Sequence, residues 1–128
     1  MFMEEGYIKL GDLQVYLMAV ELSDKAWEIY VKLGWENKKV IGFQFVSATD
    51  SVAANIAEGY GRYHYLDRIK FYYNSRGSLL ETKHWILSLY KRKMINKNEF
   101  DDFLSKANAL HWELNKYIKS CYPKNRVK

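Results

Sequence analysis

Long stretches free of helix-breaking residues most constrain what this chain can fold into. Its 128 residues include one proline, Pro123, and only seven glycines. Between the glycines, apolar side chains recur in steps of three and four, the spacing that keeps them on one face of an α-helix. The run "VIGFQFV" at 40–46 could also form a strand, but its continuation into "ATDSVAANIAE" favours a helix by length. The sequence therefore predicts an all-α fold.

Four segments carry this periodicity, at about 13–33, 40–58, 65–93 and 99–121. We expect Asp12 to cap the first helix and Gly34 to end it. Asn98, with Asp101 three residues later, resembles the capping box of the fourth helix. Short connections such as "WENKK" and "MINKN" imply that successive helices are antiparallel neighbours. Residues 1–128 are therefore expected to form a single domain, an antiparallel up-and-down four-helix bundle.

Composition and charge exclude several classes of protein. The net charge of +5 permits binding to polyanions without requiring it. A lone cysteine, Cys121, can form neither an internal disulfide nor a multi-cysteine zinc site, which suits a reducing compartment. The start "MFMEEGYIKL" does not resemble a signal peptide, and no apolar run is long enough to cross a bilayer. We expect a cytoplasmic protein that does not bind membranes.

Polar residues in "SVAANIAEGYGR" stand among small apolar residues that are expected to be buried. Ser51, Asn55 and Glu58 recur at steps of three and four, so they share one helical face. On the third helix Arg76 falls within the apolar stripe, with Glu81 nearby, and a buried arginine needs a partner. We interpret the five as a structural polar lock between the second and third helices, in which Glu58 faces Arg76 and which sets their register or holds a neighbouring subunit. Removing one member of a buried pair costs about 3–5 kcal/mol.

Glycines near these residues have expected roles of their own. Gly59 and Gly61 are expected to break the second helix. Because they precede the third helix, a phosphate cradle is an alternative, although a Gly-x-Gly after a helix is more often a cap and turn. Gly77 lies inside the third helix, where glycine costs about 1 kcal/mol relative to alanine. It is expected to let a neighbouring backbone approach closely.

An enzymatic interpretation would make Glu58 a general base beside Asn55. The motif offers no nucleophile, no metal-ligand set and no second carboxylate at a useful spacing. The three histidines, His64, His84 and His111, show no metal-binding pattern, and His111 is expected to be a core histidine with a satisfied hydrogen bond. We therefore expect no catalytic residue, metal, cofactor or small-molecule substrate.

Two basic segments are candidates for contact with nucleic acid. In "YGRYHYLDRIKFYY", Arg62 and Arg68 alternate with aromatic residues, and aromatic rings can stack on bases while cations hold phosphates. Lys91, Arg92 and Lys93 form the densest basic run, at the end of the third helix. The favoured alternative is that Tyr72 and Tyr73 lie in the core and the other aromatic residues line an oligomer contact. The helix dipole would explain the cations at the end of the third helix.

The combination of "SVAANIAEGYGR" with a later "RGSLLET" resembles the four-helix-bundle family called S23 ribosomal protein, or 23S rRNA intervening-sequence protein. The resemblance covers most of the chain. It implies a ring-like homo-oligomer, most simply a pentamer. The family name comes from reading frames inside bacterial large-subunit rRNA genes. A related branch is the basic pentameric accessory protein of diversity-generating retroelements, which is thought to engage a reverse transcriptase and nucleic acid.

One departure from the family pattern bears on function. Family members often carry a basic pair early in the second helix, where this chain has Val46 and Ser47. The sequence therefore favours a non-enzymatic homo-oligomeric scaffold, with RNA or DNA as a candidate partner. The alternative is a nucleic-acid-binding accessory protein that acts with a partner such as a reverse transcriptase.

Overall fold

The structure is a computed structural model that describes residues 9–123. Its four long helices are α1 (Gln14–Lys32), α3 (Phe43–Tyr60), α4 (Tyr65–Lys91) and α5 (Lys97–Ser120). Three short segments complete the fold: the 3₁₀ turn η1 (Leu10–Asp12), α2 (Trp35–Asn37) and the π-helical η2 (Lys38–Gly42).

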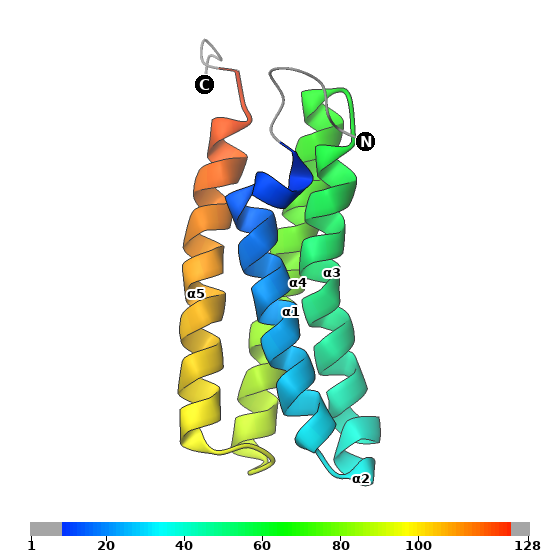
Figure 1. Cartoon of the computed structure of the whole chain (residues 1–128), viewed down its shortest axis with the longest axis vertical. Helices are drawn as coiled ribbons and strands as arrows, with labels where there is room; N and C mark the ends of the chain where they lie inside the picture. The colour runs from blue at the N-terminus through cyan, green and yellow to red at the C-terminus, as the bar shows by residue number, and fades with distance from the viewer. Residues whose placement is uncertain (1–8, 124–128) are drawn as a thin grey trace.

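The long helices run alternately up and down (Figure 1). Contacts join α1 to α3, α3 to α4, α4 to α5 and α5 back to α1, so the helices form a closed square in chain order. Figure 1 shows the start of α1, the end of α5 and the α3–α4 turn at the top, while α2 and the α4–α5 connection lie at the bottom. The predicted all-α, antiparallel four-helix bundle is confirmed.

The connection between the first two long helices differs from the predicted loop. "WENKK" is helical, because α2 continues through η2 into α3 without leaving helical backbone angles. Gly34 does not end α1 in a left-handed conformation; its φ is −71° and it precedes α2. Asp12 lies inside η1 and makes no capping bond to α1, whose N-cap is Leu13.

The fourth long helix has a capping box, two residues earlier than predicted. Asn96 Oδ1 accepts from the backbone N–H of Glu99 at 2.8 Å, and Glu99 Oε1 accepts from the backbone N–H of Asn96 at 3.0 Å. Asn98 and Asp101 are therefore not the box. The reciprocal bonds satisfy two N–H groups that a helix start otherwise leaves free, and α5 accordingly begins at Lys97.

The core is a single apolar cluster drawn from all four long helices. Its largest fully buried side chains include Phe45 of α3, Tyr72 of α4 and Phe103 of α5. The rings of Phe45 and Phe103 lie 5.1 Å apart across the diagonal of the square. Three polar side chains are also fully buried, Thr49, Ser75 and Thr82, and each has a hydrogen bond.

Candidate functional site

The α3 members of the expected polar lock bond within their own helix. Ser51 Oγ donates to the carbonyl of Ser47 at 3.0 Å, and Asn55 Nδ2 donates to the carbonyl of Ser51 at 2.9 Å. Both bonds join residues four apart along α3. Neither bond therefore bridges to α4 in the single chain.

Glu58 and Arg76 do not form the expected pair. Glu58 is exposed and accepts from Arg62, one turn later in the chain, at 2.5 Å. Arg76 lies on the side of α4 that faces α5, where its Nη1 donates to Asn115 Oδ1 at 2.8 Å. Its guanidinium also lies 4.9 Å from the ring centre of Tyr73.

Glu81, the last member of the expected lock, also bonds within its helix. Its Oε2 accepts from the indole N–H of Trp85 at 3.4 Å, one turn later on α4. The structure thus leaves the five lock residues in separate local arrangements and gathers none of them into a reaction site.

A different side chain joins α3 to α4. Ser75 is fully buried, and its Oγ donates to the backbone carbonyl of Val52 at 2.8 Å. A serine is small enough to let the two helices approach, and the bond satisfies its buried hydroxyl. Sequence reasoning missed Ser75, although its position three residues after the buried Tyr72 and four before Leu79 places it on the core face of α4.

Gly59 provides the second close contact between these helices. It is buried within α3, which continues to Tyr60, so only Gly61 stands at the helix end. A Cβ at Gly59 would lie 2.7 Å from Cε1 of Tyr72 and 3.0 Å from the backbone oxygen of Arg68. Gly59 is therefore a packing position and not a helix break. Gly61, with φ −81°, has no need of glycine's left-handed freedom.

Side chains pair across the α4–α5 contact along most of its length. Four hydrogen bonds and one ring stack follow the antiparallel register: Tyr73–Tyr122 (2.9 Å, with Tyr122 just beyond α5), Tyr72–Tyr117 (3.4 Å), Arg76–Asn115 (2.8 Å), Lys83–His111 (2.7 Å) and the stacked rings of Tyr90 and Phe100 (4.5 Å). These pairs hold α5 against the outer flank of α4. They also fix the positions of two cations on that flank.

Those two cations, Arg76 and Lys83, have neutral partners among the described residues. Burial lowers the pKa of Lys83 below its ordinary value. The pKa of His111 is also lowered, first by burial and then by the charges of Lys83 and Arg76. His111 is therefore neutral at pH 7, and its Nδ1 accepts from the Lys83 ammonium. The α4–α5 flank thus carries two positive charges that form no ion pair with a carboxylate of residues 9–123.

Apolar side chains line the outer surface of α4 beside these cations. Leu66, Tyr73, Leu80 and Leu87 follow one another at intervals of seven residues and are 64%, 40%, 52% and 44% exposed. Intervals of seven keep side chains in one row along a helix, as in a coiled-coil seam. Gly77 lies in the same surface, where an added Cβ would meet nothing within 4 Å. In the described chain no backbone approaches Gly77, contrary to our expectation.

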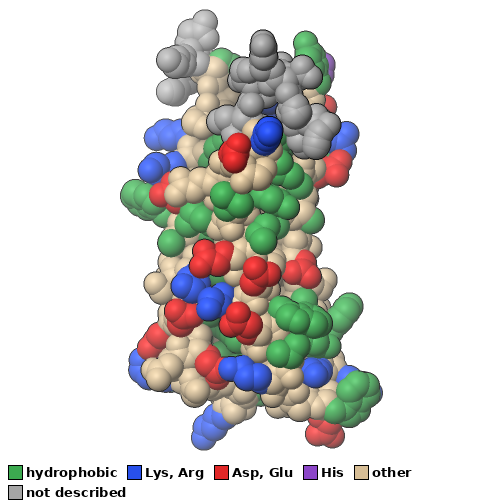
Figure 2. Space-filling model, in the orientation of Figure 1, with side chains coloured by type: hydrophobic (Ala, Val, Ile, Leu, Met, Phe, Trp, Pro, Cys, Tyr) green, Lys and Arg blue, Asp and Glu red, His purple; other side chains and the backbone are tan. Residues whose placement is uncertain are grey.

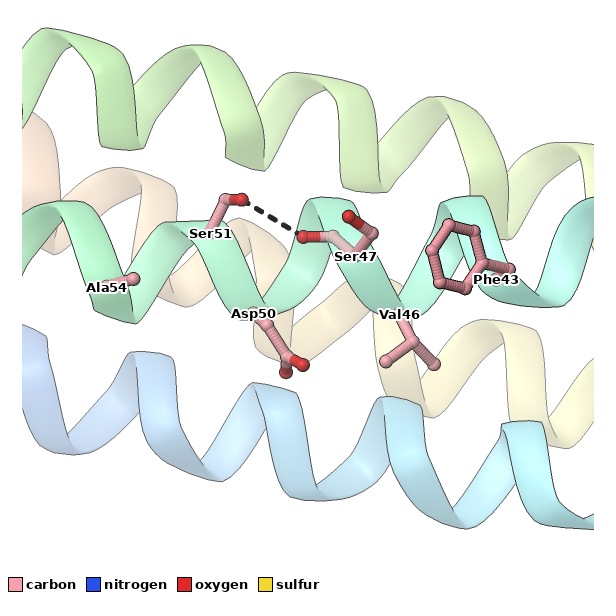
Figure 3. A pocket seen from close by; sticks show the side chains of 6 residues that line it. All are labelled: Phe43, Val46, Ser47, Asp50, Ser51 and Ala54. Atoms are coloured by element: carbon pink, nitrogen blue, oxygen red, sulfur yellow. Dashed lines mark hydrogen bonds between the residues drawn. The ribbon is translucent and has the colours of Figure 1, made fainter.

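The outward side of α3 holds a shallow hollow of about 330 Å³. It is lined by Phe43, Val46, Ser47, Asp50, Ser51 and Ala54. Figure 3 shows these side chains spread along a single helix, with α4 and α1 passing on either side. Three of the six lining side chains are small, those of Ser47, Ser51 and Ala54, and the Asp50 carboxylate is the charged group of this lining. Val46 and Ser47, the two residues at which the sequence departs from the resemblance, are both part of it.

The candidate nucleic-acid residues divide between the two ends of the bundle. Arg62 and Arg68 lie near the α3–α4 turn, whereas Lys91, Arg92 and Lys93 are exposed at the other end of α4. A helix of this length separates the groups by about 40 Å. Arg62 is paired with Glu58, and its guanidinium lies 4.7 Å from the ring centre of Phe71. The basic candidates therefore do not form one continuous surface.

Two of these basic residues have distinctive local features. Lys93 adopts a left-handed conformation, φ 62°, and its N–H bonds to the carbonyl of Tyr90 while that of Met94 bonds to Leu89. This is a Schellman C-cap, where cations also suit the helix dipole. Arg68 is half-buried, and its buried Nε has no hydrogen-bond partner among the described residues.

Neither a metal-binding cluster nor a membrane span occurs in the described part of the chain. Between residues 9 and 123, His, Cys, Asp and Glu side chains form no group of three or more that could hold a metal ion. Across the same residues, no helix has the length and apolar character to cross a membrane.

Comparison with known proteins identifies relatives that match most of the bundle. A family model described as 23S rRNA-intervening sequence protein matches residues 11–116. A crystal structure of a protein with unknown function, from the S23 ribosomal protein family of Bacteroides thetaiotaomicron, superposes with a TM-score of 0.75. The two chains share 20% sequence identity over 82% of this chain and 98% of the other, so the likeness concerns the fold. No curated protein matches the sequence.

Proposed function

Since the chain belongs to the 23S rRNA-intervening sequence protein family, we propose that it is a non-enzymatic scaffold that assembles from copies of itself. The assembly is a pentameric ring in the cytoplasm, the number being the one that the family resemblance implies. Its role is to present repeated surfaces to a partner, with RNA as the first candidate.

The amount of exposed apolar surface carries this proposal. Three of the four tryptophans, Trp27, Trp35 and Trp112, are more than half exposed, as are Phe43 and Leu80. Tryptophan and tyrosine are enriched in subunit interfaces, and extended apolar patches on a small protein mark interaction sites. Figure 2 shows such side chains gathered toward the lower end of the face over α1 and α3, next to acidic groups. A chain that buried these surfaces against copies of itself would remove them from water.

Light scattering on the purified protein tests this function. The expected result is a mass about five times the 15.2 kDa of one chain, unchanged on dilution across the working range. A mass of one chain at every concentration would contradict the scaffold. A stable assembly of another number would retain the scaffold and overturn the pentamer.

A nucleic-acid-binding accessory protein, acting beside an enzyme such as a reverse transcriptase, is the second candidate. Exposed Lys91, Arg92 and Lys93 favour it, because a ring would repeat this weak cationic cluster around one end. Binding to RNA should weaken steeply with salt, since phosphate contacts release counterions. Changing all three residues to Glu should then abolish binding at low salt while leaving the mass unchanged. Wild-type protein that binds no RNA at low salt would exclude this candidate.

A further inference from the structure

We propose that the outer surface of α4 in one copy of the chain binds the hollow of α3 in the next copy. The first surface, the α4 ridge, consists of Tyr73, Arg76, Leu80, Lys83 and Leu87. The second, the α3 hollow, consists of Phe43, Val46, Ser47, Asp50, Ser51 and Ala54. This inference rests on the proposed self-assembly and names the two surfaces that would produce it.

The two surfaces are complementary in shape. The α4 ridge projects large apolar side chains, with Leu80 52% exposed at its centre. The α3 hollow offers small side chains, Ser47, Ser51 and Ala54, between which such a row can insert. From Phe43 to Ala54 α3 advances about 17 Å, and from Tyr73 to Leu87 α4 advances about 21 Å, so the ridge is long enough to fill the hollow along its length. Ridges of one helix packing into grooves of another are the usual mode of helix association.

Gly77 adds a second reason for placing a helix on this surface. It lies at the surface of α4, and a Cβ there would meet nothing within 4 Å among residues 9–123, so no contact between described residues explains a glycine in mid-helix. Glycine in that position costs about 1 kcal/mol relative to alanine. A neighbouring helix that approaches α4 at Gly77 accounts for that cost, because the missing side chain shortens the distance between the two backbones.

The charges of the two surfaces favour contact between the α4 ridge and the α3 hollow. The α4 ridge carries Arg76 and Lys83, whose hydrogen-bond partners are the neutral side chains of Asn115 and His111. The α3 hollow carries Asp50, which forms no salt bridge within residues 9–123. Two copies that met ridge to ridge would bring like charges together, which is unfavourable, whereas ridge to hollow joins opposite charges.

A contact between two different surfaces determines the symmetry of the assembly. Each copy would offer one ridge and one hollow, so copies add in the same sense around an axis. Such a head-to-tail contact closes into a ring when the rotation between neighbours allows it. A two-fold dimer would use it only if one interface paired each copy's ridge with the other copy's hollow. The separation of ridge and hollow onto different helices is therefore compatible with the proposed ring, and the measured mass distinguishes the ring from a dimer.

Charge reversal tests the contact on the full-length chain. Asp50→Lys alone, and Arg76→Glu with Lys83→Glu, should each raise the dissociation constant of the assembly by roughly 100-fold or more. Combining all three changes in one chain should restore assembly. Asp24→Lys, the same change on the surface of α1, is the matched control and should leave the mass unchanged. Circular dichroism should show native helix content in every variant, since none of the reversed groups belongs to the buried core.

Each outcome separates this inference from the function on which it rests. Wild-type protein that is monomeric refutes the scaffold itself. If the wild-type protein assembles and either charge reversal leaves the mass of the assembly unchanged, only the ridge-to-hollow contact is refuted. The contact is equally refuted if the triple variant fails to reassemble, or if the ridge reversal abolishes RNA binding without changing the mass. Gly77→Tyr provides an uncharged test: it should keep the fold, because the site is open among the described residues of one chain, and should block assembly.

Discussion

Replacing Gly59 with alanine should destabilise the bundle, although alanine is the better helix former. In an open helix the change would gain about 1 kcal/mol. Here the added Cβ would lie 2.7 Å from Cε1 of Tyr72, 3.0 Å from the backbone oxygen of Arg68 and 3.0 Å from Cβ of Phe71. The last two atoms belong to the α4 backbone or are bonded directly to it, so no side-chain rotation removes them and the helices must separate.

The size of the effect follows from two opposing contributions. Overpacking a close-fitted site costs typically 1–3 kcal/mol, and a contact with immovable backbone belongs at about 3 kcal/mol. Subtracting the propensity gain of about 1 kcal/mol leaves a net loss of about 2 kcal/mol. For a domain of this size, that loss corresponds to a fall of roughly 8 °C in melting temperature.

Gly61 supplies the matched control, two residues away. A Cβ there would lie 3.7 Å from the carbonyl oxygen of Glu58 and 3.8 Å from that of Ala57, both ordinary contacts. Gly61→Ala should therefore leave stability unchanged or raise it by up to about 1 kcal/mol. Urea unfolding followed by circular dichroism, at one protein concentration, measures both. Equal or greater stability of Gly59→Ala relative to Gly61→Ala would refute the close-packing argument.

Three further predictions concern polar side chains. Ser75→Ala should cost about 1 kcal/mol in urea unfolding, because it removes the buried hydroxyl that joins α4 to α3. Glu58→Ala should cost no more than about 0.5 kcal/mol in the same assay, since its pair with Arg62 is exposed and lies within one turn; a loss of about 3 kcal/mol would restore the buried-pair interpretation. The His111 pKa is lowered in the folded state, so the unfolded chain takes up this proton first as pH falls. The free energy of unfolding should therefore decrease as pH falls below about 6.5. If the wild-type protein loses no more stability over this pH range than His111→Gln does, the contact between His111 and Lys83 is contradicted.

The sequence was sufficient to predict the four long helices because their apolar positions repeat over many turns. Helix ends that depend on one capping side chain were less predictable. Asn98 and Asp101 have the right spacing for a capping box, but Asn96 and Glu99 have it too, and only the backbone decides which pair faces the free N–H groups. "WENKK" was expected to be a loop because nothing in its composition shows that a π-helical segment continues it into α3.

The candidate site was predicted less well, for a geometric reason. Arg76 lies in the apolar row of α4, so the sequence indicates that it needs a partner, but the partner depends on which neighbour that flank faces. The flank faces α5, and Asn115 is the partner. Ser75, which does face α3, carries no charge and was not singled out, although its spacing from Tyr72 placed it in the core. Contacts between helices require the order of the helices around the bundle, and periodicity alone does not supply it.

Disulfide trapping tests most directly whether outward-facing helices join copies of this chain. A chain carrying Asp50→Cys, Leu80→Cys and Cys121→Ser places one thiol in the α3 hollow and one on the α4 ridge. Mild oxidation should link successive copies into a covalent ladder that ends at the closed ring, while chains with only one of the two new cysteines should remain monomeric under denaturing conditions. Monomers alone from the two-cysteine chain, or equal dimers from either single-cysteine chain, would contradict the account.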